Sequence, residues 1–143
     1  MTNLTAIAGS LPRLRLTRDS IARALGWLTP AAGAGNGVRT LAFWDEDSVT
    51  LATAASRRAL QYGRREEVEA LYLATATPPF AEPQCAALTH AALRLPPACR
   101  AEDMRGGARA GLAALHAALE AGRPALVAAA DIPVAKPGSV AES

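Results

Sequence analysis

Aromatic side chains are scarce in this chain. Phe, Trp and Tyr make up only 4% of the 143 residues, although half of the composition is apolar. Alanine supplies much of that apolar content, which favours small-residue packing between helices and a sheet over an all-β sandwich. The length suits about one domain, with enough apolar residues for a sizeable core.

The chain has almost no excess of positive over negative charge, since the formal net charge is only +2. The arginines are scattered, and no aromatic side chains alternate with them as they do in proteins that bind single-stranded nucleic acid. We therefore expect no nucleic-acid partner.

Long apolar runs are absent. No stretch reaches the ~20 apolar residues that span a bilayer, and the amino terminus carries no basic segment ahead of an apolar run. We therefore expect no membrane partner and a cytoplasmic location. The two cysteines, Cys85 and Cys99, lack metal-ligand spacing and are expected to be buried structural thiols in a reducing compartment.

Short apolar runs alternate with longer amphipathic segments along the chain. Strands are predicted at residues 4–8, 38–43, 68–75 and 125–130, the last two so continuously apolar that a buried parallel sheet is expected. Helices are predicted from a Thr17 cap to about residue 25, from the acidic run 45–48 onward, and at residues 84–93 and 108–119. On the last helix Ala108, Leu112, Leu115 and Leu119 fall on one stripe.

This order predicts an α/β fold with a mostly parallel sheet of about four strands and helices on both faces. We expect one half-domain over residues 1–132. Residues 133–143 are rich in proline, glycine and serine and are expected to form an exposed tail.

Local motifs for chemistry are weak. The glycine-rich stretch 33–37 precedes a strand instead of following one, so it fits a flexible loop better than a dinucleotide-binding turn. A helix start explains Asp45, Glu46 and Asp47 better than a metal or acid/base site does. His90 and His116 have no companion ligands at metal spacing, so packed or surface histidines are expected and no metal site is predicted.

Four segments in order nevertheless resemble the thiolase superfamily, in particular hydroxymethylglutaryl-CoA synthase-like and ketoacyl synthase-like proteins. They cover nearly the whole chain: residues 11–16 with the helix that ends at Gly26 and Trp27, residues 45–50, residues 71–80, and residues 103–115 with 129–131 and 136–139. The resemblance implies the amino-terminal half of a thiolase-like fold.

The resemblance also implies a vacated catalytic site. It places Ala108 where catalytic members carry a cysteine at a helix amino terminus, a position that stabilises the thiolate nucleophile. In hydroxymethylglutaryl-CoA synthases the strand matching Ala74 and Thr75 ends with an acid/base glutamate, which this chain lacks. The family's catalytic histidine lies in the second half of the fold, beyond Ser143. No catalytic residue is therefore assigned, and the substrate-binding residues stay unknown.

Three functions remain open, of which a structural α/β module unrelated to acyl transfer has the least support. The first is a catalytically incomplete subunit of an acyl-CoA-handling complex, with no bound cofactor and a coenzyme A thioester as its possible substrate. The second is an active acyl-CoA or acyl-carrier-protein condensing enzyme, or its truncated piece, with a non-standard site. The resemblance implies a homo-oligomer or a thiolase-type partner subunit, and an OB-fold zinc-ribbon protein as a further partner. The chain is expected to be a short paralogue, a truncated gene product or a fragment.

Overall fold

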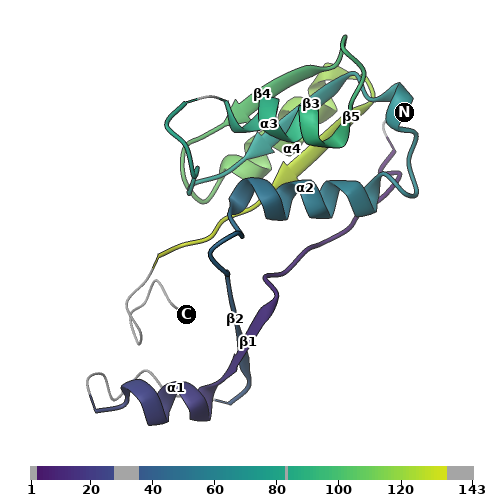
Figure 1. Ribbon diagram of the computed structural model, residues 1–143. Coiled ribbons are helices and arrows are strands. Elements are labelled where there is room, and N and C mark those ends of the chain that lie inside the picture. Colours follow the sequence, from purple (N-terminus) through teal and green to yellow (C-terminus); the bar gives the residue numbers. More distant parts are fainter. Residues whose placement is uncertain (1–2, 28–35, 83, 135–143) are drawn as a thin grey trace. The chain divides into compact units, whose positions relative to one another are not determined.

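A computed structural model describes residues 3–27, 36–82 and 84–134 of the chain. The chain divides into two compact units (Figure 1). The first consists of Met1–Ser10 and Asp47–Asp131, and the second of Leu11–Glu46 and Ile132–Ser143. The first unit contains the parallel sheet and is the larger of the two.

The sheet of the first unit has three parallel strands in the order β4-β3-β5. β3 (Ala70–Ala74) lies in the centre, with β4 (Arg100–Met104) on one side and β5 (Ala125–Ala129) on the other. All five β3 residues are buried, as the continuous apolar run predicts for a central parallel strand.

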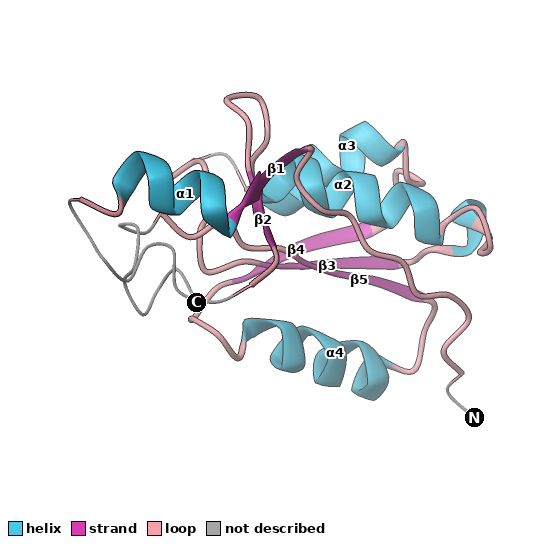
Figure 2. Cartoon of the chain, turned by 90° about the horizontal axis from the view of Figure 1, so that it is seen from below, coloured by secondary structure: helices cyan, strands magenta, loops and turns pink. Residues whose placement is uncertain are grey.

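Helices cover both faces of this sheet (Figure 2). On one face, α2 (Ser48–Ala59) and α3 (Cys85–Leu93) pack against each other and enclose Leu71 and Leu73 of β3. On the other face, α4 (Ala110–Ala121) packs on Ala70, Tyr72 and Ala74. The predicted α/β fold class is thus confirmed, as a three-layer arrangement. The parallel sheet has three strands among the described residues instead of about four, because the predicted strand at residues 38–43 belongs to a separate antiparallel pair.

The packing face of α4 differs from the predicted stripe. Ala110, Ala114 and Ala118 are buried against the sheet, whereas Leu112, Leu115 and Leu119 are 70%, 43% and 49% exposed. Small side chains let the helix approach the strands closely: a Cβ added at Gly111 would lie 3.3 Å from the Ala129 Cβ. The alanine stripe therefore faces the sheet, and the leucine stripe faces outward.

Three predicted or unassigned segments also differ from the sequence analysis. Residues 4–8 form no strand, since their side chains are largely exposed and make no ladder pairing. Strand β4 was missed because Arg100, Glu102 and Asp103 give its segment a polar appearance, which an edge strand tolerates. Strand β1 (Leu14–Thr17) was missed as well.

The second unit is built on a two-stranded antiparallel ribbon. β1 pairs with β2 (Val38–Leu41), a strand that the sequence predicts, and α1 (Arg18–Leu25) follows β1 directly. The Thr17 hydroxyl accepts a hydrogen bond from the Ser20 amide at 3.2 Å, so the predicted cap is confirmed. The glycine-rich stretch lies mostly outside the described residues, as does the tail from residue 135 onward.

Within the described ranges, no helix combines the length and the apolar character that crossing a membrane requires.

Candidate functional site

The carboxyl edge of the parallel sheet brings together three of the segments that carry the family resemblance. β3 continues into Thr75, Ala76 and Thr77, β4 continues into the loop 105–109, and β5 continues into Ala130 and Asp131. Two backbone bonds extend the ladder past the strand ends, from the Thr75 amide to the Met104 carbonyl and from the Ala130 amide to the Ala74 carbonyl. The three strand ends are thus held side by side, where open α/β sheets commonly place ligands.

Asp131 fixes the segment that follows β3. Its Oδ1 atom accepts hydrogen bonds from the Ala76 amide at 2.6 Å, the Thr77 amide at 3.2 Å and the Thr75 hydroxyl at 3.1 Å. One carboxylate therefore satisfies several donors of a turn that has no regular structure of its own. The sequence analysis missed this role, although an aspartate directly after an apolar strand was visible.

Asp103 performs a similar task at the end of β4. Its carboxylate accepts hydrogen bonds from the Cys85 amide at 3.0 Å and the Ala86 amide at 2.6 Å. These two donors belong to the first turn of α3, and Gln84, the N-cap residue, supplies no side-chain hydrogen bond. Asp103 thus replaces a local helix cap from a distant point in the sequence.

The loop between β4 and α4 carries Ala108. Gly106 and Gly107 have φ angles of +140° and +89°, which a residue with a side chain rarely adopts. The Ala110 amide bonds back to the Gly107 carbonyl at 3.0 Å. Ala108 is exposed and lies one residue before Arg109, the N-cap of α4, so the helix begins slightly later than predicted.

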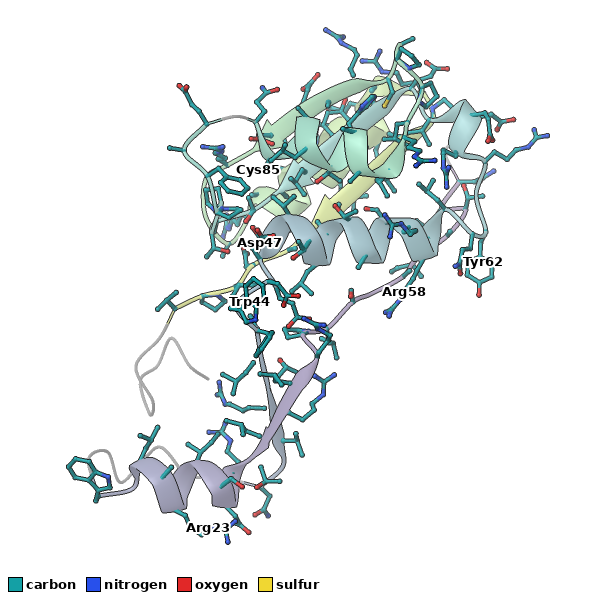
Figure 3. All side chains as sticks on the ribbon, viewed as in Figure 1. Arg23, Trp44, Asp47, Arg58, Tyr62 and Cys85 are labelled. Atoms are coloured by element: carbon teal, nitrogen blue, oxygen red, sulfur yellow. The ribbon has the colours of Figure 1, made fainter. Side chains whose placement is uncertain are left out.

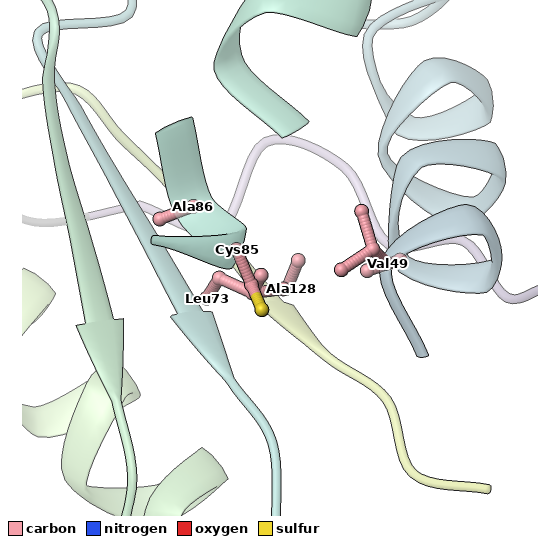
Figure 4. Close-up of a cluster of buried hydrophobic side chains, with 6 residues drawn as sticks. Val49, Leu73, Cys85, Ala86 and Ala128 are labelled. Carbon is pink, nitrogen blue, oxygen red and sulfur yellow. The ribbon is translucent and has the colours of Figure 1, made fainter. Parts of the chain in front are cut away.

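Neither cysteine offers a thiol to this edge. Cys85 is fully buried and packs with Leu73 and Ala128 in the core (Figure 4). Cys99 is also buried, and desolvation raises the pKa of its thiol above the ordinary value of 9.0. The prediction of two buried structural thiols is confirmed.

Neither histidine is paired with a nucleophile or with a group at this edge of the sheet in the described contacts. The His90 Nε2 atom lies 3.1 Å from the Pro96 carbonyl oxygen, and His116 is an exposed residue of α4 that faces Glu120 at 3.6 Å. The described residues contain no group of three His, Cys, Asp or Glu side chains that could hold a metal ion.

The acidic run 45–47 has three separate structural roles. Asp47 caps α2, with its Oδ1 atom accepting from the Thr50 amide at 2.7 Å. In the second unit, Glu46 accepts from the Arg13 and Phe43 amides, and Asp45 pairs with the Arg13 guanidinium. The hydrogen bond to Asp45 raises the pKa of Arg13. The helix-start interpretation is confirmed for Asp47 (Figure 3).

A small polar hollow of about 130 Å³ lies at the amino end of α1 in the second unit. Thr17, Arg18, Asp19, Asn36 and Gly37 line it. The Thr17 hydroxyl already caps the helix, and the Arg18 amide is bonded to the Gly37 carbonyl at 3.1 Å. These bonds engage the Thr17 hydroxyl and the backbone at the start of α1, and no residue that the sequence singles out for catalysis lines the hollow.

The fold of the chain is similar to that of solved thiolase-like proteins. The structure of MvaS in complex with 3-hydroxy-3-methylglutaryl coenzyme A superposes with a TM-score of 0.82 and 27% identity, over 96% of this chain and 36% of that one. The chain is thiolase-like, of the hydroxymethylglutaryl-CoA synthase and 3-oxoacyl-carrier-protein synthase III type.

Two further comparisons agree with this thiolase-like assignment. A 3-oxoacyl-(acyl-carrier-protein) synthase III structure matches with a TM-score of 0.76 and 28% identity, over 90% of this chain and 41% of that one. The hydroxymethylglutaryl-CoA synthase of Methanosphaera stadtmanae is 28% identical over 123 residues, which are 83% of this chain and 36% of the relative.

The thiolase-like match is partial. The chain spans about two fifths or less of the length of these relatives, and its fold corresponds to their amino-terminal half. No family model matches the sequence.

Proposed function

We propose that this chain is a catalytically incomplete, thiolase-like subunit that contributes an acyl-CoA-handling surface to a larger acyl-transfer assembly. The observation that carries the proposal is the loop before α4. The resemblance assigns the nucleophile position to Ala108, whose methyl group cannot form a thioester, and Cys85 and Cys99 are both buried in the core.

The neighbouring groups do not replace the missing thiol. The segment after β3, where the resemblance places an acid/base glutamate, contains Ala76 and Thr77 instead. Asp131 and Asp103 are carboxylates at the described strand ends, and both already accept hydrogen bonds from backbone amides. Their hydrogen bonds fix the segment after β3 and the start of α3, which is a structural role and not a nucleophilic one.

The substrate class follows from the relatives. One matching structure is MvaS with 3-hydroxy-3-methylglutaryl coenzyme A, and an OleA structure at 22% identity holds lauric acid and lauroyl-CoA. A coenzyme A thioester is accordingly the ligand class proposed for this chain.

The outward face of α4 supports a subunit role. Leu112, Leu115 and Leu119 form an exposed stripe opposite the buried alanines, so the helix is apolar on both sides. A helix with that character is typical of an interior position. The proposed occupant of this stripe is a second thiolase-like half, and an OB-fold zinc-ribbon protein is a further proposed member of the assembly.

Intact-mass spectrometry tests the catalytic part of this proposal. The purified chain is incubated with acetyl-CoA, acetoacetyl-CoA or lauroyl-CoA, and its mass is compared with that of the untreated protein. The expected result is no covalent acyl adduct. An acyl adduct that maps to the loop 105–109 or to either cysteine would refute the assignment as an incomplete enzyme.

A matched pair of variants tests the subunit role. Leu115→Lys places a charge on the outward stripe of α4, whereas Ala113→Lys places it on an exposed alanine of the same helix. We expect the leucine variant to lose association with a thiolase-type partner in sedimentation experiments, and the alanine variant to retain it. Equal association of both variants would contradict packing through the leucine stripe.

A further inference from the structure

Ser48 is a buried serine whose hydroxyl bonds outside its own helix. It is the first residue of α2, it is 1% exposed, and its Oγ atom donates a hydrogen bond to the Thr77 carbonyl at 2.9 Å. Thr77 belongs to the segment that follows β3. The bond therefore joins the start of α2 to the carboxyl edge of the sheet.

The ordinary role of a serine at a helix start is to cap the helix, and other residues fill that role here. The Asp47 carboxylate accepts from the Thr50 amide at 2.7 Å, and the Thr50 hydroxyl accepts from the Asp47 amide at 2.7 Å. The capping box is thus complete without Ser48. Since burying an unpaired hydroxyl is unfavourable, the contact with Thr77 accounts for a serine at this position.

Thr77 is held by groups from different parts of the fold. Its amide donates to the Asp131 carboxylate at 3.2 Å and to the Thr75 hydroxyl at 3.1 Å, while its carbonyl accepts from Ser48. The next residue, Pro78, also restricts the Thr77 backbone to extended conformations. Because the amide and the carbonyl of Thr77 are both bonded, the chain has little freedom just after β3.

Ala76 is the residue that this arrangement presents to solvent. It is exposed, whereas Thr75 before it is buried and Thr77 after it is half-buried. The Ala76 amide donates to Asp131 at 2.6 Å, so its backbone is fixed as well. Ala76 therefore has a defined place at the end of β3, on the side of the sheet where open α/β folds commonly bind ligands.

We propose that Ser48 is a positioning residue for ligand binding: through the Thr77 carbonyl, it holds residues 75–77 in the shape that receives a coenzyme A thioester. The ligand class rests on the proposed function, and the positioning role rests on the hydrogen bond from α2. A preformed surface loses less freedom when its ligand binds. Release of the segment therefore weakens binding although Ser48 itself does not touch the ligand.

Two buried serines of α2 form a matched pair for testing this role. Ser48→Ala removes the hydroxyl that reaches Thr77. Ser56→Ala removes a similarly buried hydroxyl that has no hydrogen-bond partner in the described part of the chain. Ser48→Thr is the rescue variant, since it keeps a hydroxyl at the same position. Amide NMR spectra of the full chain give both the exchange rates and the shifts caused by added acetyl-CoA.

We expect Ser48→Ala to speed amide exchange at Ala76 and Thr77 about tenfold and to weaken acetyl-CoA binding about fivefold. Ser56→Ala and Ser48→Thr should match the unmodified chain in both measurements. The amides of residues 52–58, in the middle of α2, should exchange at the same rate in all four proteins. This last readout separates positioning from a general loosening of the helix.

Four outcomes would overturn the proposal: equal exchange at residues 76 and 77 in Ser48→Ala and Ser56→Ala, faster exchange throughout α2 in Ser48→Ala, an unchanged acetyl-CoA affinity of Ser48→Ala, or a folded Ser48→Thr variant that behaves like Ser48→Ala. An unmodified chain that shows no shift with acetyl-CoA would refute the ligand class of the proposed function instead. Exchange at residues 76 and 77 then still decides whether Ser48 positions the segment.

Discussion

Removal of the Asp103 carboxylate should loosen the start of α3. The side chain is only 8% exposed and accepts from the Cys85 and Ala86 amides, which have no local cap. Loss of a helix cap costs about 1 kcal/mol, and each buried donor left without a partner costs about 1–3 kcal/mol. Asp103→Ala should therefore lower the free energy of unfolding by about 2–4 kcal/mol.

Asp103→Asn provides an intermediate case. The amide keeps one oxygen acceptor but loses the charge at the positive end of α3, so we expect a loss of about 1–2 kcal/mol. Glu102→Ala, on the adjacent exposed position of β4, is the matched control and should change stability by less than about 0.5 kcal/mol.

Urea denaturation followed by circular dichroism measures these differences. The linear dependence of the unfolding free energy on urea gives each value, provided that the variants share one slope. If Asp103→Ala were as stable as Glu102→Ala, the carboxylate would not cap α3, and the account of how β4 positions this helix would be wrong.

Three other substitutions test local features of the first unit. The Thr89 hydroxyl is fully buried and has no hydrogen-bond partner among the described residues. Thr89→Val should therefore leave stability unchanged or raise it in thermal unfolding, and a loss above about 1 kcal/mol would contradict the absence of a partner. Arg94 ends α3 and Gly122 ends α4, and both have left-handed backbone angles, with φ of +52° and +61°. Arg94→Gly should raise the free energy of unfolding by about 1 kcal/mol, and Gly122→Ala should lower it by about 1 kcal/mol. Changes of the same sign in the two variants would contradict the left-handed caps. Because burial raises the pKa of Cys99, unfolding should become easier as pH rises above 9.0, and Cys99→Ala should lessen that dependence in denaturation curves at pH 8 and 10.

Local signals in the sequence were sufficient for the elements that local chemistry determines. The apolar run of β3 predicts a central strand, and Asp47 and Thr17 predict helix starts because their caps involve residues only three positions away. Elements whose formation depends on distant partners were harder to predict from the sequence. Residues 4–8 resemble a strand, but a strand requires ladder pairing, and these residues pair with no strand of the described part of the chain.

The candidate site likewise contains features that the sequence predicts and features that depend on long-range contacts. The resemblance placed Ala108 at the amino terminus of the last helix, and the structure has it in the loop just before that helix. The roles of Asp103 and Asp131 depend on contacts with segments 17 or more residues away. The face of α4 was misjudged because both its alanines and its leucines follow helical periodicity. Hydrophobicity favours the leucines, but the short distance between helix and sheet selects the alanines.

The thiol pKa of Ala108→Cys tests the central claim most directly. If Ala108 occupies the vacated nucleophile position, the amino end of α4 and the nearby Arg109 should stabilise the thiolate. The matched control is Ala113→Cys, an exposed position one turn further along α4, because Cys85 and Cys99 are shielded by burial. The rate of iodoacetamide alkylation as a function of pH gives both pKa values.

The account predicts a lower pKa and faster alkylation at neutral pH for Ala108→Cys than for Ala113→Cys, with no acetoacetyl-CoA or hydroxymethylglutaryl-CoA formed by the variant alone. Equal or higher pKa at position 108 would contradict the claim of a vacated active site, and product formation would contradict the claim that the chain is catalytically incomplete.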